Sequence, residues 1–295
     1  MLSKPLFKGS GVALISPFTE NDSVDFETLE KLIEFQIENG TKAIIVCGTT
    51  GESAVLSEKE RDEIINFSVN KINQRVPLIV GTGSNNTKHA GKLSERACEL
   101  GADALLVVTP YYNKSSQDGI AAHYEYICKR VSVPVIVYNV PSRTGVNINP
   151  ETYTRISKFE NVVATKEANG DISSVIKTRA LCDKSLDIYS GNDDQTLPII
   201  SVGGIGVISV FANVCPKESQ QICELAGKEP EKAAELLLEF QGLMEALFVD
   251  VNPIPVKAAL NLMKFRCGSC RLPLTSLSPK NLEKLKNELF KHNLI

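Results

Sequence analysis

The chain has 295 residues, 43% of them hydrophobic and 23% charged, so it can bury a large core and is neither disordered, collagen-like nor of low complexity. Its 32 Lys and Arg residues against 35 Asp and Glu residues give a formal net charge of -3, without the basic excess that binding to a phosphate backbone requires. We therefore expect no nucleic-acid partner.

The predicted strands are short runs rich in Val and Ile, each bounded by Gly, Pro or polar residues and followed by a helical pattern. Eight such runs begin about 28 residues apart on average, close to the ~30 residues of one βαβ unit. Near-continuous apolar strands of this kind are buried on both faces and belong to parallel sheets. The series predicts an α/β protein with a closed (β/α)8 TIM barrel. The predicted strands are residues 11–18, 43–48, 77–83, 104–110, 134–139, 161–168, 186–192 and 206–212.

An open, doubly wound sheet is the alternative to the barrel. Such a sheet would carry a G-x-G-x-x-G turn after its first strand. The nearest match, Gly81 and Gly83 followed by Asn86, lacks the third glycine and follows the third strand. The sequence therefore favours the barrel.

Helix signals lie between the strands. Leu29 and Ile33 fall on one face of the first helical stretch, and Ser57 with Glu60 forms a capping box at the start of the second. Pro150 is suited to the first turn of a later, short helix. The predicted helices thus have sequence signals of their own, in addition to those of the strands.

The strand signal stops after residue 229. Helical patterns follow at residues 230–249, 254–264 and 279–291, and Pro230 suits the start of the first of them. We therefore predict a barrel domain in residues 1–229 and an all-helical C-terminal appendage in residues 230–295.

Membrane and secretion signals are not found in the sequence. No apolar run approaches the ~18 residues that a membrane span requires, and the start, MLSKPLFKGSG, lacks the apolar core of a signal peptide. The eight cysteines are scattered and too dilute for a disulfide scaffold, so we interpret them as reduced thiols. We expect a cytoplasmic protein with no membrane partner.

Lys166 is the sharpest functional signal, since barrel enzymes place their active sites at the carboxyl ends of the strands. It lies inside an apolar strand, where its ammonium group must lose water. Burial lowers the pKa of a lysine and leaves free amine for attack on a carbonyl, as a Schiff-base enzyme requires. The alternative is a lysine paired with Glu167 or placed at a frayed strand end, and the sequence leaves both open.

Other strand ends carry groups that can bind a small acid. The G-T-T-G turn at residues 48–51 offers backbone N–H groups and the hydroxyls of Thr49 and Thr50, although a simple Gly-rich turn is the alternative. Tyr138 is a candidate proton donor and acceptor, and Arg143 a candidate bidentate carboxylate anchor. The alternatives are that Tyr138 only packs in the strand and that Arg143 is a solvated loop residue.

Metal and cofactor signals are weak. Cys267 and Cys270 have C-x-x-C spacing but no second pair of ligands, and His89, His123 and His292 are dispersed. We expect neither a metal nor a cofactor.

Taken together, the motifs closely resemble the dihydrodipicolinate synthase family of pyruvate-dependent class I aldolases, a superfamily that includes N-acetylneuraminate lyase. The resemblance extends over nearly the whole chain. All motifs occur in the family's order, which makes the signal specific. They are G-T-T-G-E-S at residues 48–53, Y-Y at 111–112, Y-N-V-P-S-R-T-G at 138–145, K-E at 166–167 and G-N-D at 191–193.

The resemblance implies a condensation of pyruvate with L-aspartate 4-semialdehyde, on the diaminopimelate route to lysine. Lys166 would form an imine with pyruvate, and its enamine tautomer would be the carbon nucleophile. Tyr138 would relay protons through Thr49 to Tyr112, a residue that in the family reaches the active site of the neighbouring subunit. We therefore expect a homo-oligomer that is at least a dimer. Because tetramers are common in the family, we expect a tetramer.

The same resemblance assigns the binding roles. Arg143 would bind the carboxylate of the semialdehyde, and Thr49 with Thr50 that of pyruvate. The backbone at Gly191 and Ile208 would shape the imine pocket. Thr49-Thr50 and Arg143 favour the synthase over sialic acid lyases, while a 2-keto-3-deoxy sugar acid aldolase and a catalytically inactive regulatory paralogue are the remaining alternatives.

Feedback inhibition is expected to be weak or absent. In lysine-inhibited relatives the allosteric cleft at the dimer interface uses His residues after the G-T-T-G-E-S-A segment and a Glu in the following helix. Here Glu58, Arg61 and His89 stand at those places. An added cation and a lost helix carboxylate disfavour the ammonium groups of lysine. Four further cleft positions are retained, namely Ser53, Ala54, Asn85 and Tyr111.

Overall fold

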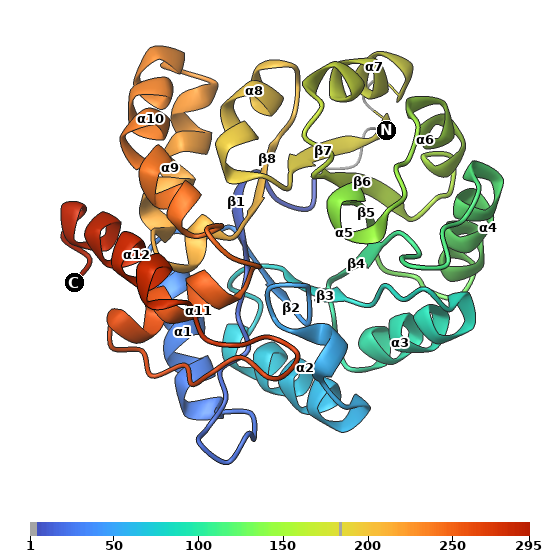
Figure 1. Cartoon of the computed structure of the whole chain (residues 1–295). Coiled ribbons are helices and arrows are strands. Elements are labelled where there is room, and N and C mark those ends of the chain that lie inside the picture. The colour runs from blue at the N-terminus through green and yellow to red at the C-terminus, as the bar shows by residue number, and fades with distance from the viewer. Residues whose placement is uncertain (1–4, 183–184) are drawn as a thin grey trace.

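The computed structural model describes residues 5–182 and 185–295; residues 1–4, to which the interpretation of the chain's start also refers, lie outside them. In the described residues eight parallel strands form a closed barrel in chain order, with the helices around it (Figure 1). Strand β1 closes the barrel against β8, where Gly11 lies beside Ile208. The predicted TIM barrel is confirmed, and the open sheet is excluded. The strands are β1 (Gly9–Ala13), β2 (Ala43–Val46), β3 (Leu78–Gly81), β4 (Ala104–Val108), β5 (Val135–Asn139), β6 (Val162–Glu167), β7 (Asp187–Ser190) and β8 (Gly206–Ser209).

The helices of the barrel begin where the sequence signals predict. The Ser57 hydroxyl accepts a hydrogen bond from the backbone N–H of Glu60, whose carboxylate accepts one from the N–H of Ser57, so the capping box is confirmed. Pro150 occupies the first turn of α6, as predicted. The helices are α1 (Phe26–Glu38), α2 (Glu58–Ile72), α3 (Thr87–Glu99), α4 (Gln117–Cys128), α5 (Pro141–Thr144), α6 (Pro150–Ile156), α7 (Ile172–Cys182), α8 (Thr196–Ser201) and α9 (Pro216–Ala226).

The first predicted strand extends too far. Strand β1 ends at Ala13, whereas the apolar run continues to Phe18. Leu14 still donates one ladder hydrogen bond, to Ile45 O at 2.9 Å, but the N–H of Ile15 donates to the side-chain Oδ1 of Asn213 at 3.2 Å rather than to a strand. Leu14 and Phe18 are buried between the strands and the helices. These apolar residues therefore serve helix packing rather than the sheet.

Apolar side chains fill two cores, one inside the barrel and one between the strands and the helices. Ile45 packs inside, whereas Ile44 and Val46 on either side of it pack outward. On β6, Ala164 and Ala168 belong to the inner core. Residue 166 has the same parity, so its side chain also projects into the barrel.

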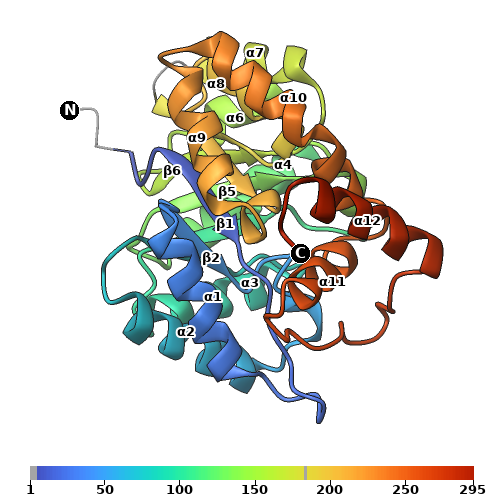
Figure 2. The same ribbon diagram turned by 90° about the vertical axis from the view of Figure 1, so that its left-hand side faces the viewer.

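Three C-terminal helices complete the fold, namely α10 (Pro230–Ala246), α11 (Ile254–Leu262) and α12 (Pro279–Lys291). Figures 1 and 2 show them on one side of the barrel, with α12 beside α11. Leu243 and Leu285 share the outer core with the barrel helices. The helical appendage is confirmed. A domain boundary at residue 229 stays a prediction, since one core continues across it.

Candidate active site

The candidate residues from several strand ends meet around one cavity of about 200 Å³. The cavity lies at the carboxyl ends of the strands, where barrel enzymes carry out their chemistry. Its walls also include residues from the segment that joins α10 to α11. The lining includes Gly48, Thr49, Thr50, Tyr138, Arg143, Lys166, Gly191, Val210, Phe248 and Asn252.

Lys166 projects into this cavity from β6 and is 5% exposed. Its Nζ lies 4.4 Å from the centroid of the Tyr138 ring, and the two residues are direct partners across β5 and β6. Within residues 5–182 and 185–295, no carboxylate forms a salt bridge with Nζ. The alternative of an ion pair with Glu167 is therefore wrong.

Glu167 points the other way, into the layer between the strands and the helices. Its Oε1 accepts a hydrogen bond from Asn139 Nδ2 and its Oε2 one from the Tyr153 hydroxyl, each at 2.8 Å. Burial raises the pKa of Glu167 to about 7, while these hydrogen bonds oppose the rise. Asn139 Nδ2 also donates to Asn147 Oδ1 at 2.7 Å, which ties the segment after α5 to β5. Apart from the K-E pair, no motif in the sequence indicates this network.

Thr50 and Arg143 are joined by a residue that the sequence did not single out, Asn252. Its Nδ2 donates to Thr50 Oγ1 at 2.9 Å, and its carbonyl accepts from Arg143 Nη2 at 3.1 Å. Asn252 is 5% exposed, and its Oδ1 is buried without a hydrogen-bond partner among the described residues. A buried acceptor without a partner in a polar cavity indicates a place for a donor from a ligand.

Tyr112 does not enter the cavity of its own chain. Its side chain is 88% exposed and its φ is +70°, a left-handed conformation that is unusual for a bulky residue. In the described part of the chain Tyr138, Thr49 and Tyr112 share no hydrogen bond. The proton relay through Tyr112 therefore stays a prediction that requires a second subunit.

Gly191 and Ile208 occupy different places. Gly191 lines the cavity, and its N–H donates to Glu167 O at 2.7 Å. Ile208 is fully buried in the core inside the barrel. Val210, which follows the end of β8, lines the cavity instead.

A second cavity of about 610 Å³ adjoins the first, since both are lined by Thr49, Arg143 and Asn252. It contains six of the seven candidate allosteric residues. Asn85 does not line it; its carbonyl accepts a hydrogen bond from Asn113 Nδ2 at 3.1 Å. The six are Ser53, Ala54, Glu58, Arg61, His89 and Tyr111.

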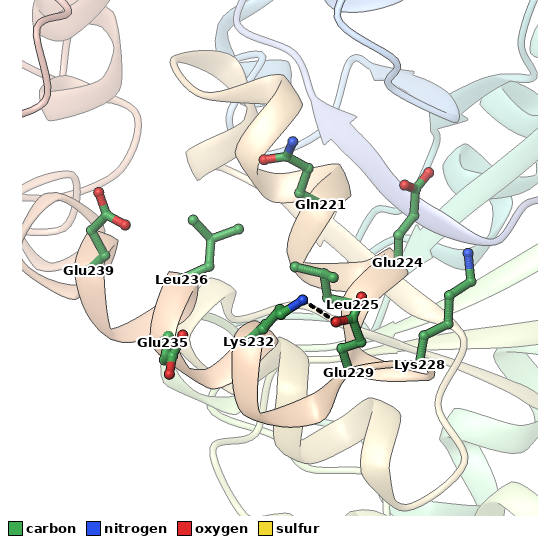
Figure 3. A pocket seen from close by; sticks show the side chains of 9 residues that line it. All are labelled: Gln221, Glu224, Leu225, Lys228, Glu229, Lys232, Glu235, Leu236 and Glu239. Atoms are coloured by element: carbon green, nitrogen blue, oxygen red, sulfur yellow. Dashed lines mark ion pairs between the residues drawn. The ribbon is translucent and has the colours of Figure 1, made fainter.

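A third hollow, of about 550 Å³, lies between the outer helices α9 and α10 (Figure 3). Its walls are mostly charged, and Lys232 forms an ion pair with Glu229 there. It contains none of the candidate site residues, so we assign it no part in the chemistry.

The structure also places the features that gave weak signals. Cys267 and Cys270 are free thiols, and burial raises the pKa of each to about 12. Burial lowers the pKa of His123 to about 4. In the part of the chain described, no group of three or more His, Cys, Asp or Glu residues could hold a metal ion. None of the helices in those residues has the length and apolar character of a membrane span.

Comparisons with known proteins show which family the chain resembles. The model of the dihydrodipicolinate synthetase family matches residues 6–292. The chain is 54% identical to the 4-hydroxy-tetrahydrodipicolinate synthase of Caldicellulosiruptor bescii, over 98% of each chain. It is 53% identical to that of Thermoanaerobacter sp., over 99% of this chain and 98% of the relative. The solved dihydrodipicolinate synthase of Thermotoga maritima has a TM-score of 0.96 and 45% identity, with 98% of this chain and 100% of the other covered.

Proposed function

The chain belongs to the dihydrodipicolinate synthetase family, and we propose that it makes 4-hydroxy-tetrahydrodipicolinate from pyruvate and L-aspartate 4-semialdehyde through an imine on Lys166. The two curated relatives described above, which match over nearly the full length, are named for this synthase and not for a sugar acid aldolase or a sialic acid lyase. The observation that carries the mechanism is the buried Lys166 beside Tyr138 in the cavity. The same proposal places the chain on the diaminopimelate route to lysine, in the cytoplasm.

The first half of the proposed reaction prepares the nucleophile. The Lys166 amine adds to the keto carbon of pyruvate, a C–N bond forms and water leaves, which gives a protonated imine. The imine draws electrons from the methyl group, so the loss of a methyl proton yields an enamine. The phenol of Tyr138, on the strand beside Lys166, is the group that we assign to these proton transfers. No cofactor is needed, because the imine itself is the electron sink.

The second half joins the two substrates. Thr49 and Thr50 hold the pyruvate carboxylate through hydroxyl and backbone donors, while Arg143 holds that of the semialdehyde at the mouth. The enamine carbon attacks the aldehyde carbon and forms the C–C bond. The amine of the semialdehyde then attacks the imine carbon, which closes the ring and releases Lys166.

The experiment that tests this function is reduction with borohydride in the presence of pyruvate, followed by mass spectrometry. We expect one stable adduct, on Lys166. Lys166→Ala should lose the adduct and at least a thousandfold of kcat. Lys177→Ala, which removes an exposed lysine of α7, is the matched control and should retain both. An unlabelled wild type, or full turnover by Lys166→Ala, would contradict the mechanism.

We also propose a homo-oligomer, a dimer at least and a tetramer by comparison with the family, in which Tyr112 of the partner subunit completes the relay. The exposed, left-handed Tyr112 supports it. Mixing inactive Lys166→Ala subunits with Tyr112→Ala subunits should restore activity, since a mixed dimer contains one complete site. Either variant alone should stay weak, and a mixture that stays equally weak would contradict the proposal.

A further inference from the structure

The loop that follows β2 is held from behind by a buried ion pair. Glu52 ends the G-T-T-G-E segment with a φ of +54°. Its Oε1 lies 2.7 Å from Lys257 Nζ in α11, and its Oε2 accepts a hydrogen bond from the backbone N–H of Arg271 at 2.8 Å. The two side chains of the pair are 1% and 2% exposed. One carboxylate thus connects the loop to two separate parts of the C-terminal region.

The surroundings of Lys257 leave it little freedom. Its Nζ also donates to Ser269 O at 2.9 Å and lies 4.0 Å from the centroid of the Phe18 ring. A buried ion pair of this kind seldom adds net stability over apolar residues of similar size, and its best-attested use is to fix one geometry. The pair is therefore better suited to positioning than to holding the fold together.

Two further contacts fix the same loop. Asn252, which precedes α11, donates to Thr50 Oγ1 at 2.9 Å. From the barrel side, Ser16 Oγ donates to Gly51 O at 2.8 Å. A Cβ at Gly51 would meet Leu14 O at 3.1 Å, so the turn is packed closely against the chain that leaves β1. The loop is thus clamped between the barrel and the C-terminal helices.

We propose that Glu52 and Lys257 are positioning residues that set the place of Thr49 and Thr50, and with it the affinity for pyruvate, without touching the substrate. Neither residue lines the cavity around Lys166, whereas both threonines do. The inference rests on the proposed function, in which those threonines hold the pyruvate carboxylate. A displacement of the loop by a fraction of an ångström should therefore weaken imine formation more than it weakens binding at Arg143, which is linked to the loop indirectly, through Asn252.

The test uses the full-length protein and measures the pyruvate concentration that gives half-maximal borohydride labelling of Lys166. The double variant Glu52→Gln with Lys257→Met removes both charges, so that neither is left buried and unpaired. We expect its half-saturating pyruvate concentration to rise by about tenfold, as small misplacements in active sites do, with the KM for the semialdehyde within about twofold. Glu52→Asp, which keeps the charge but withdraws it, is the variant to use if the double variant does not fold, with about a threefold rise expected.

Leu285→Ala is the control for a general loss of stability. It empties a buried position in α12 and lowers the melting temperature without touching the loop. Its half-saturating pyruvate concentration should equal that of the wild type. The inference is overturned if the double variant and Glu52→Asp label like the wild type, or if Leu285→Ala shows the same rise. An unlabelled wild type would instead refute the proposed function, and the inference with it.

Discussion

Two neighbours on β6, Lys166 and Glu167, face opposite environments. The Lys166 side chain projects into the polar cavity, whereas the Glu167 carboxylate is buried beside Asn139 and Tyr153, between the strands and the helices. The pKa of Glu167, raised by burial to about 7, lies above the 4.5 of an exposed glutamate. Between these pH values the folded chain holds a proton that the unfolded chain has lost, so stability falls as the pH rises through this window.

The change Glu167→Gln should remove this loss of stability at rising pH. In the wild type the loss is about 3 kcal/mol once the pH exceeds 7. His123, whose pKa is lowered to about 4, acts in the opposite direction between pH 4 and 6.5 and cancels in the comparison of the two proteins. We therefore expect the free energy of unfolding of the variant, relative to the wild type, to improve by about 3 kcal/mol from pH 4 to pH 8. Urea denaturation at several pH values measures it, and a pH-independent difference would contradict it.

Residues near the site differ in how far the sequence reveals them. Lys166 could be predicted because a lysine within an apolar strand is locally anomalous. Asn252 and Lys257 could not, since their partners Thr50 and Glu52 lie more than 200 positions away, and each looks like an ordinary polar residue of the helical region. Contacts of that range depend on how the helices dock, which a local pattern does not encode.

At the scale of elements, the sequence predicts the beginnings of the strands more closely than their ends. The start of β4 at Ala104 coincides with the predicted one, because a polar turn precedes it. The predicted end of β8 at residue 212 overshoots Ser209, because Val210, Phe211 and Ala212 are apolar for packing rather than for pairing. Hydrophobicity marks burial, and burial continues past the last ladder hydrogen bond.

The junction of β1 and β8 gives a prediction for the barrel's closure. Gly206 pairs with Gly9, and a Cβ at Gly206 would collide with the carbonyl oxygen of Gly9. Because neither backbone can retreat, Gly206→Ala should lower the free energy of unfolding by about 3 kcal/mol or more. Gly227→Ala, at the end of α9 with open space around it, should change it by less than about 1 kcal/mol. Equal stability of the two variants in denaturant titrations would contradict this account.

At the scale of the whole molecule, we expect any regulation by L-lysine to depend on the cavity beside the candidate active site. Arg61 is 7% exposed, donates to Gly81 O and lines this cavity with His89, where lysine-inhibited relatives have His and Glu. We expect L-lysine at 1 mM to inhibit by less than half, because its ammonium groups meet the guanidinium of Arg61 and find His89 where those relatives have a carboxylate. Activity measured against added lysine checks this, and half-inhibition at sub-millimolar lysine would refute it. His89→Glu should increase whatever inhibition is seen.

The ion pair between Glu52 and Lys257 also has a consequence for the synthesis of the chain on the ribosome. During translation the ribosome completes β8 at Ser209 well before it reaches Lys257 and Arg271. A nascent chain that already contains all eight strands thus still lacks both partners of the Glu52 carboxylate. If Glu52 and Lys257 position Thr49 and Thr50 as proposed, an unfinished chain would bind pyruvate weakly until its last helices have left the exit tunnel.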